Sequence, residues 1–463
     1  MRGLHFEMLT VQKLVVMCRS PLGEWSFQRS QHMDQNRFRR MVSLRPFLPF
    51  VVYLVFPSLL IEAKNTKLEE VFHWNLLDFD YPDDTSRSNS IESKQFIPEN
   101  NLPLGLEVWN DKLFVTVPRW KSGVPSTLNY VSLSGDNKSP KLIPYPDWNS
   151  NHLPTGRTEE GNVTENGIHI ISVFRVRVDA CDRLWMLDTG LNDVVGEAQQ
   201  LQDPRILIYD LRNDSLIHSY TLKSSHIKED SFFANIIVDV DTNDCEGAFA
   251  YIPDLGGYSL IVYSLKGDES WRVKHHYFHF DPLNGNYSVG GVNFQWVDGV
   301  FSLALSAPHD DGFRTAYFHP LSSTNEFSVS TKVLRNKTLA TDPHNFEEFK
   351  LLGSRGPHTQ AGASFLDEQS SVVFYTQVNL NGVGCWNSKS KEYSPEYQHL
   401  VTSDNETFIF PNDLKVDRGS NLWVLIDRLP IFIYRGLDPE SINFYIFKGS
   451  VKEIIKDTIC EKN

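Results

Sequence analysis

Residues 179–187 read Asp-Ala-Cys-Asp-Arg-Leu-Trp-Met-Leu, and residues 417–425 read Asp-Arg-Gly-Ser-Asn-Leu-Trp-Val-Leu. In both stretches an aspartate precedes a tryptophan by six positions, and a short polar turn leads into an apolar run. The same combination of turn and strand at two distant places predicts a repeated structural unit rather than a single motif.

Six apolar runs, each following a turn rich in Asp, Asn or Gly, recur along residues 100–450. They begin at Leu113, Leu184, Ala248, Phe301, Val372 and Leu422 and are interpreted as second strands. Another run precedes the turn, as at residues 174–179, and a third follows, as at residues 205–210, 260–264 and 431–435. One such unit cannot bury both faces of its sheet, so the units must pack in a ring. The predicted fold is all-β: a six-bladed β-propeller of four-stranded antiparallel blades.

The ring needs a closing strand, and both ends of the repeat supply a candidate. Residues 71–75 and residues 442–447 are expected to complete the last blade together. Beyond residue 63 the chain has four cysteines, which allow three pairings. We favour Cys181–Cys245 and Cys385–Cys460, because each pair then joins neighbours in the ring and the second pair holds the closure.

The first 63 residues differ from the rest. An apolar run at residues 47–61 follows Arg45 and is interrupted by two prolines, which is typical of a secretory signal rather than of a membrane anchor. We predict an upstream extension at residues 1–40, a cleaved signal peptide at residues 41–63 and a single propeller domain at residues 64–463. The mature protein is expected to be secreted, with no stable membrane insertion.

Charge restricts the partners. The whole chain has a formal charge of −14, and residues 1–63 contain eight Lys or Arg and four Asp or Glu, so signal removal leaves −18. Such a surface repels nucleic acid and attracts small cations. Sequons spread over the chain support secretion. The predicted glycosylation sites are Asn137, Asn162, Asn213, Asn286, Asn336 and Asn405. The oligomeric state stays open, since the sequence has no heptad or amphipathic tail.

Two catalytic motifs can be weighed against the repeat. Asp188-Thr-Gly follows two apolar residues as in an aspartic protease, but that chemistry needs a second Asp-Thr-Gly or Asp-Ser-Gly, and the sequence has none. Asp188 instead begins a loop of the second unit. His275 and His276 would point to opposite faces of a strand, so with His279 they form no ligand set. We therefore predict no metal and no cofactor.

The chain resembles the insect Yellow and major royal jelly protein family over residues 70–450. The resemblance rests on motifs spread along the sequence. They are residues 105–120 (Gly-Leu-Glu-Val-Trp-Asn-Asp-Lys-Leu-Phe-Val-Thr-Val-Pro-Arg-Trp), 123–131 (Gly-Val-Pro-Ser-Thr-Leu-Asn-Tyr-Val), 145–148 (Tyr-Pro-Asp-Trp), 179–190 (Asp-Ala-Cys-Asp-Arg-Leu-Trp-Met-Leu-Asp-Thr-Gly) and 410–415 (Phe-Pro-Asn-Asp-Leu-Lys). The resemblance implies a secreted six-bladed propeller. Family members act in cuticle pigmentation and behaviour, convert dopachrome, bind biogenic amines or serve as food, and the absence of a low-complexity tail favours the Yellow type.

Propellers bind ligands where loops converge at one end of the central channel. The side chains predicted there combine a carboxylate, amides and aromatic rings, which suit an aromatic amine or a catechol. The predicted ligand-binding residues are Asp188, Phe233, Asn235, Asn293, Thr359, Gln360 and Asn412. In an enzyme, dopachrome tautomerisation would use His358 as the base and Arg119 as an anion partner.

We therefore expect a secreted protein of cuticle pigmentation and the melanin pathway that binds a small aromatic amine or catechol in its channel. The sequence leaves open whether it also converts dopachrome. A non-catalytic structural or signalling glycoprotein of the cuticle is the first alternative. A metal-dependent, lactonase-like hydrolase is the second, because Asn412-Asp413 would suit a channel Ca²⁺, although a matching Glu is missing.

Overall fold

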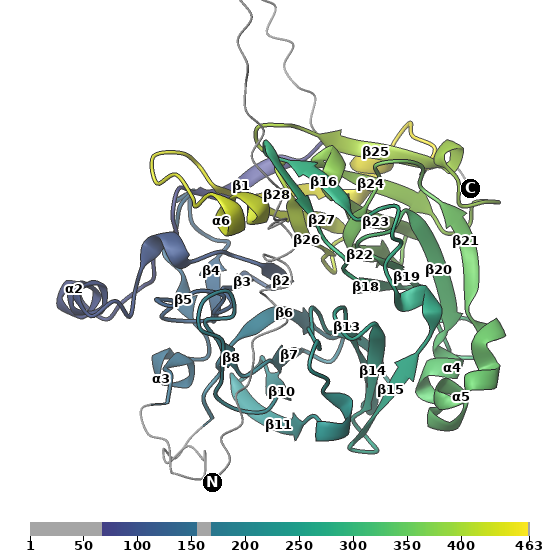
Figure 1. Ribbon diagram of the computed structural model, residues 1–463, viewed down its shortest axis with the longest axis horizontal. Helices are drawn as coiled ribbons and strands as arrows, with labels where there is room; N and C mark the ends of the chain where they lie inside the picture. Colours follow the sequence, from purple (N-terminus) through teal and green to yellow (C-terminus); the bar gives the residue numbers. More distant parts are fainter. Residues whose placement is uncertain (1–66, 155–167, 462–463) are drawn as a thin grey trace, which may run out of the picture.

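The computed structural model describes residues 67–154 and 168–461, which leaves the predicted extension, signal peptide and Asn162 outside the described residues. Within the described ranges, six four-stranded antiparallel sheets stand around a common centre, as Figure 1 shows. The predicted six-bladed β-propeller is confirmed. From the innermost strand outward, blade I consists of β2 (Gly105–Trp109), β3 (Lys112–Thr116), β4 (Leu128–Ser132) and β5 (Ile143–Pro144), and blade II of β6 (Val173–Val178), β7 (Arg183–Asp188), β10 (Arg205–Asp210) and β11 (Ser215–Thr221). In the same order, blade III consists of β12 (Ile237–Asp241), β13 (Asp244–Asp254), β14 (Ser259–Ser264) and β15 (Glu269–Lys274), and blade IV of β18 (Val300–Leu305), β19 (Thr315–Pro320), β20 (Asn325–Ser330) and β21 (Lys350–Ser354). Blade V consists of β22 (Ala361–Asp367), β23 (Val372–Gln377), β24 (Gly382–Asn387) and β25 (Gln398–Ser403), and blade VI of β26 (Pro411–Val416), β27 (Asn421–Ile426), β28 (Phe444–Ser450) and β1 (Glu69–Trp74).

Blade VI joins the two ends of the domain. β1 pairs antiparallel with β28, and Trp74 lies opposite Phe444. Phe72 and Trp74 are buried, and the indole N–H of Trp74 donates to the carbonyl of Pro140, between β4 and β5, at 2.8 Å. Three late strands and one early strand therefore share a sheet, which is the closure predicted from the sequence.

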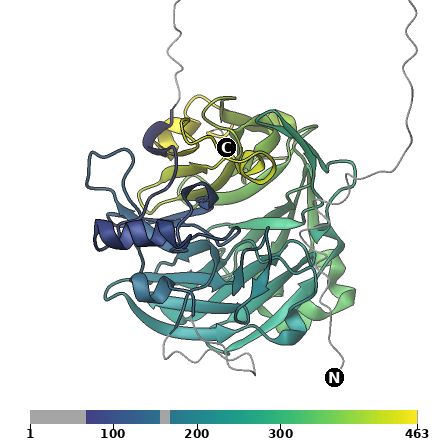
Figure 2. The same cartoon turned by 60° about the vertical axis from the view of Figure 1, so that its left-hand side comes forward.

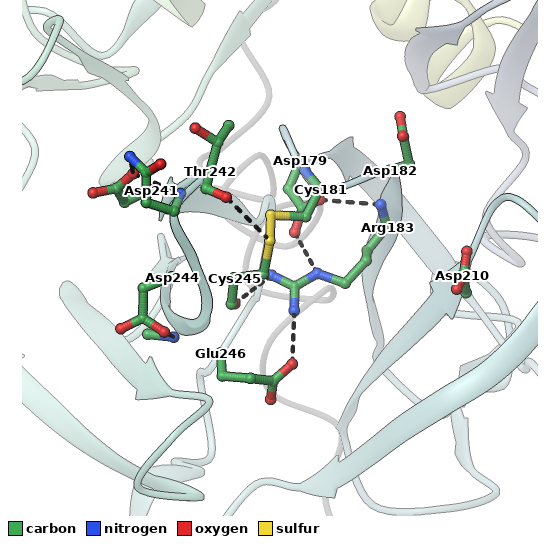
Figure 3. The surroundings of a disulfide bond; sticks show 12 residues. Asp179, Cys181, Asp182, Arg183, Asp210, Asp241, Thr242, Asp244, Cys245 and Glu246 are labelled. Atoms are coloured by element: carbon green, nitrogen blue, oxygen red, sulfur yellow. Dashed lines mark hydrogen bonds and ion pairs between the residues drawn. A yellow bond between two sulfur atoms is a disulfide. The ribbon is translucent and has the colours of Figure 1, made fainter.

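Both predicted disulfides are present. Cys181, in the turn after β6 of blade II, is bonded to Cys245, near the start of β13 in blade III, as Figure 3 shows. Cys385 in β24 is bonded to Cys460, which follows α7 (Val451–Ile455), and this pair is fully buried. The first disulfide thus links neighbouring blades, and the second fixes the end of the chain to blade V.

The turns at residues 179–185 and 417–423, each with an Asp six positions before a Trp, share one hydrogen-bond pattern. The indole N–H of Trp185 donates to Asp179 at 2.7 Å. In blade VI the indole of Trp423 donates to Asp417 at 2.8 Å. The other carboxylate oxygen accepts backbone N–H groups inside each turn. These donors are Cys181 and Arg183 in the first turn, and Gly419 and Asn421 in the second. The six-residue spacing therefore lets one carboxylate hold both the turn and the tryptophan of the next strand.

The prediction of a second strand at Phe301 is wrong. Val300–Leu305 is the innermost strand of blade IV, and β19 is the second. The preceding residues form a separate hairpin, β16 (Asn286–Val289) with β17 (Val292–Gln295). Because this hairpin buries alternate apolar side chains in the core cluster, it resembles two strands of a blade.

The prediction of a third strand at residues 431–435 is also wrong. Leu429–Tyr434 is helix α6, and the third strand of blade VI is β28. Arg428 before it has a positive φ of 53°, and Pro430 stands in the first turn, where its missing N–H costs nothing. The aromatic and β-branched residues suggested a strand, but Leu429 and Phe432 are buried three residues apart, on one helical face.

The remaining elements are short. Figures 1 and 2 show α2 outside blade I, and Figure 1 shows α4 and α5 beside blades III and IV. The other elements are α2 (Asp84–Glu92), α3 (Trp148–Asn151), α4 (Thr331–Arg335), α5 (Lys337–Thr341), β8 (Leu191–Asn192), β9 (Gln199–Gln200) and the 3-10 helices η1 (Pro98–Asn100), η2 (Ser224–His226), η3 (His276–Phe278), η4 (Pro343–Glu348), η5 (Val378–Leu380) and η6 (Pro395–Tyr397). Among the helices of the described residues, none has the length and apolar character needed to span a membrane.

Candidate functional site

The innermost strands surround the centre of the ring, and Arg175 of β6 reaches across it. One terminal nitrogen of its guanidinium donates to the carbonyl of Ala234, just before β12, at 3.0 Å. The other donates to the backbone and side-chain oxygens of Asn412 in β26, at 2.9 and 2.6 Å. The guanidinium carbon lies 4.4 Å from the centre of the Phe301 ring in β18. Blades II, III, IV and VI therefore meet at one buried cation.

A buried carboxyl group adjoins Asn412. The amide Nδ2 of Asn412 donates to Asp427, which directly follows β27 and is fully buried. The backbone N–H of Leu429 donates to the other carboxyl oxygen at 3.1 Å. Burial raises the pKa of Asp427 to about 8, although both hydrogen bonds oppose the shift. This group can therefore hold or release a proton near neutral pH, as a general acid or base must.

The neighbouring carboxylate, Asp413, is neutralised by cations. Lys415 donates to it at 2.8 Å, and the backbone N–H of Leu106 in β2 donates at 3.0 Å. Nε of Arg175 lies 3.4 Å from the same carboxylate. Asp413 is fully buried, so these partners are needed to offset the loss of its hydration.

Small polar side chains continue around the centre. Asn235, before β12, donates to the hydroxyl of Ser302 in β18 at 3.3 Å. Ser302 donates in turn to the carbonyl of Ser364 in β22 at 3.2 Å. All of these side chains are buried at the start of, or within, the innermost strands. We call the following set the channel layer: Arg175, Asn235, Ser302, Asn412 and Asp427.

Aromatic rings lie at the mouth end of the channel, where the chain enters innermost strands or leaves second strands. They are Trp120, Phe174, Phe232, Trp296 and Phe410. The centres of the Phe174 and Phe232 rings are 5.0 Å apart, and Trp120 lies 5.8 Å from Phe174. All five pack in the apolar cluster that includes residues of α6. A planar ligand at this mouth would meet ring faces and edges beside the channel layer.

Helix α6 begins two residues after Asp427 and is held on both sides. The ammonium of Lys121, in the loop after β3, donates to the carbonyl of Phe432 at 3.0 Å. The indole N–H of Trp296 donates to the hydroxyl of Tyr434 at 3.0 Å. A ligand can therefore reach the buried carboxyl of Asp427 only after α6 or a neighbouring loop moves.

The seven predicted ligand residues do not all come together. Asn235 and Asn412 belong to the channel layer. Asp188 is the last residue of β7, in a position like that of Asp427 directly after β27, but its oxygens accept the backbone N–H groups of residues 171–172 at 2.9 and 2.8 Å. Asp188 thus braces the chain that enters β6.

The other four lie outside the channel layer. Phe233 packs in the apolar cluster between blades II and III. Thr359 hydrogen-bonds within its own loop, and Gln360 donates to the carbonyl of Asn284 at 3.0 Å, next to the β16–β17 hairpin. Asn293 is exposed on β17. Ligand contact by these residues stays a prediction.

The two predicted catalytic residues differ in exposure and in the hydrogen bonds that they already make. His358 is exposed, with a positive φ of 61°, in the loop that enters β22. Arg119 is buried, and burial lowers its pKa to about 10. Every N–H of its guanidinium donates to a backbone carbonyl, which leaves none for a substrate anion among the contacts described. The acceptors are Val124, Pro125, Asn151, Ile170 and Ile171.

Arg175 and Asp427 were not predicted as site residues. Arg175 stands in a strand that was predicted, and an arginine flanked by apolar residues there is a signal for a side chain that faces the channel. Asp427 occupies the position of Asp188 and Asp254 in earlier blades, directly at the end of the second strand.

Two cavities lie at the rim, away from the channel. One, of about 540 Å³, is lined by His275, His276 and His279, and burial lowers the pKa of His275 to about 4. The other, of about 510 Å³, lies against α4 and α5. Across the described ranges, no group of three or more His, Cys, Asp or Glu is placed to hold a metal ion.

The chain is similar to known proteins in sequence and in fold. The family described as Major royal jelly protein matches residues 171–460. Protein yellow of Drosophila erecta is 39% identical over 401 residues, which cover 85% of this chain and 71% of that protein. Dopaminechrome tautomerase of Drosophila melanogaster is 38% identical over 401 residues, covering 86% and 84%. Among solved structures, virginiamycin B lyase from Staphylococcus aureus matches with 9% identity and a TM-score of 0.37, covering 70% of this chain and 78% of the lyase.

Proposed function

Because this chain belongs to the Yellow and major royal jelly protein family, we propose that it acts outside the cell in cuticle pigmentation, by binding a small aromatic amine or catechol at the mouth of its channel. The likeness to Dopaminechrome tautomerase, which spans 84% of that relative, is the observation that carries the proposal. Two disulfides support an extracellular site of action, because such bonds persist in oxidising compartments.

The chemistry of the mouth supports this class of ligand. Trp120 and Phe174 are buried at the mouth, so a catechol or indole ring would stack on them once α6 or a neighbouring loop moves. The indole N–H of Trp120 is buried without a hydrogen-bond partner among the described residues, so it is a donor for a ligand oxygen. The acidic chain, with a formal charge of −14, attracts an ammonium group.

We further propose that the ligand is an aminochrome and that the protein isomerises it. A C–H bond beside the quinonoid ring breaks, an O–H bond forms, and neither an oxidant nor a reductant is consumed. Asp427 takes the proton from carbon in its ionised form, whose share grows as the pH approaches its pKa of about 8. The Arg175 cation close to it stabilises the negative charge that develops on oxygen. His358 is the competing base proposed from the sequence.

The test uses the protein of residues 64–463 with dopamine, serotonin and dopaminechrome. Calorimetry measures binding, and absorbance follows dopaminechrome decay. We expect D427N to lower kcat by about 10²- to 10⁴-fold, the range for loss of a general base, while dopamine still binds. H358A serves as the matched control. A rate unchanged in D427N but lost in H358A would transfer the role of base to His358.

A carrier that binds amines without turnover is the second candidate function. It is favoured by the full burial of Asp427, because a ligand held at the mouth would not touch this carboxyl. Dopamine binding without protein-dependent decay would identify the carrier. Absence of both signals would contradict the proposal and leave a structural role in the cuticle.

A further inference from the structure

The rim cavity beside α4 and α5 has an aromatic wall. Its volume is about 510 Å³, and its lining includes Phe249, Trp271 and Phe313. The guanidinium carbon of Arg335 lies 5.1 Å from the Phe249 ring and 5.7 Å from the Phe313 ring. Arg335 is itself paired with Asp239 at 2.6 Å. Arg335 therefore holds both rings in place and leaves them half-buried at the surface.

A glycosylation sequon stands at the edge of the same cavity. Asn336 and Thr338 of the sequence Asn-Lys-Thr both line it and are exposed. The Oδ1 atom of Asn336 accepts the backbone N–H of Leu339 at 3.1 Å and so caps α5. This bond fixes the orientation of the amide and leaves Nδ2, the atom that carries an N-linked glycan, without a partner among the described contacts. Attachment at Nδ2 preserves the capping oxygen.

We propose that Asn336 carries an N-linked glycan whose first sugars lie in this cavity against Phe249 and Phe313. A sugar ring presents C–H groups on one face, and these meet the electron-rich faces of aromatic rings. The hydroxyl edges of the sugar would face Lys337 and Glu269, which form an ion pair of 2.6 Å at the rim. Because the glycan is tethered at the cavity, its local concentration is high enough for weak contacts to hold it.

The other sequons provide an internal comparison. Asn137, Asn213, Asn286 and Asn405 are also exposed. None of these four lines either of the two rim cavities. A glycan at these positions would extend into solvent. The inference does not involve the channel and is independent of the proposed function.

The first experiment tests attachment, using secreted protein from insect cells and mass spectrometry of glycopeptides. The matched variants are T338V, which abolishes the sequon and keeps Asn336 as the helix cap, and T338S, which keeps both. We expect the wild type and T338S to carry a glycan at Asn336 and T338V to lack it. An unmodified Asn336 in protein that is modified at other sequons would overturn the proposal.

The second experiment tests docking by releasing glycans with an amidase from the folded protein. We expect release at Asn336 to be about tenfold slower than at the other occupied sequons, as ~1.4 kcal/mol of docking would produce. F313A should remove this difference, and denaturation should remove it in the wild type. Equal rates in the folded wild-type protein would overturn docking. Since that comparison is made within one protein, it stands even if F313A does not fold.

Discussion

Asp179 and Asp417 accept equivalent hydrogen bonds but differ in burial. Asp179 is 3% exposed and also accepts from the guanidinium of Arg183 at 2.7 Å, as Figure 3 shows, whereas Asp417 is partly exposed. In the D179A variant, Trp185 and Arg183 would lose a buried acceptor that water cannot replace. We expect D179A to lower the free energy of unfolding by about 3 kcal/mol and D417A by about 1 kcal/mol. Urea unfolding measures both, and an equal loss would contradict the role of burial.

Asp427 gives the stability of the protein a pH dependence of known sign. Its folded-state pKa of about 8 lies above the usual carboxyl value, so the folded state holds a proton that the unfolded state releases. This group therefore favours folding least above pH 8, and its contribution is lost as the pH rises from about 4 to about 8. In D427N we expect this loss to disappear.

Thermal unfolding of the wild type and D427N between pH 5 and 8 checks this expectation. D427N lacks the titrating group. The substitution can add a constant difference in stability, but the free energy of unfolding of D427N should rise relative to that of the wild type as the pH increases. Asn412, which donates to Asp427, supplies the control, because N412D would place a second carboxyl there and steepen the dependence. A constant difference between D427N and the wild type would show that Asp427 does not titrate in this range.

At the scale of elements, the two disulfides tie different structures and should differ in reactivity. Cys181–Cys245 joins the β6–β7 turn to the start of β13, and both of its residues are partly exposed, whereas Cys385–Cys460 is fully buried. A thiol must contact a sulfur atom to exchange with it, so mild reductant should open only the first bond in the folded protein. Alkylation followed by mass spectrometry reads out the four cysteines. Modification of Cys385 before Cys181 would contradict this order.

The elements also show what the sequence could predict. Strands with a turn signal before them, such as β7 and β27, were found because the Asp-to-Trp spacing reflects a hydrogen bond inside each unit. The strand at Phe301 was assigned to the wrong place in its blade, and helix α6 was predicted as a strand because its apolar pattern serves contacts at the channel mouth. Local patterns do not distinguish such contacts from packing within a blade. The aromatic run of α6 therefore predicts a strand, although it forms a helix.

At the scale of the whole molecule, the candidate site is a product of ring closure. Arg175 and Asn412 are far apart in the sequence, yet β6 and β26 bring them to 2.6 Å because blades II and VI both flank blade I. Loop composition could suggest that Asn412 faces the channel. It could not show that an arginine from another blade satisfies its oxygen, since this depends on the register of two strands in separate sheets. The site was therefore predictable by region and only partly by residue.

Closure itself yields the last prediction. A chain that begins at residue 64 keeps β1, and a chain that begins at residue 76 loses it and leaves β28 as an open edge. The shorter chain also loses the buried rings of Phe72 and Trp74, each worth about 3–5 kcal/mol in a core. We expect its melting temperature to fall by on the order of 10 °C and the exposed edge to promote aggregation. A synthetic peptide of residues 64–78 should restore the melting temperature by pairing with β28, whereas a peptide with Phe72 and Trp74 replaced by Ala should not. Equal melting temperatures for the two chains would mean that the buried Cys385–Cys460 bond alone holds the ring shut.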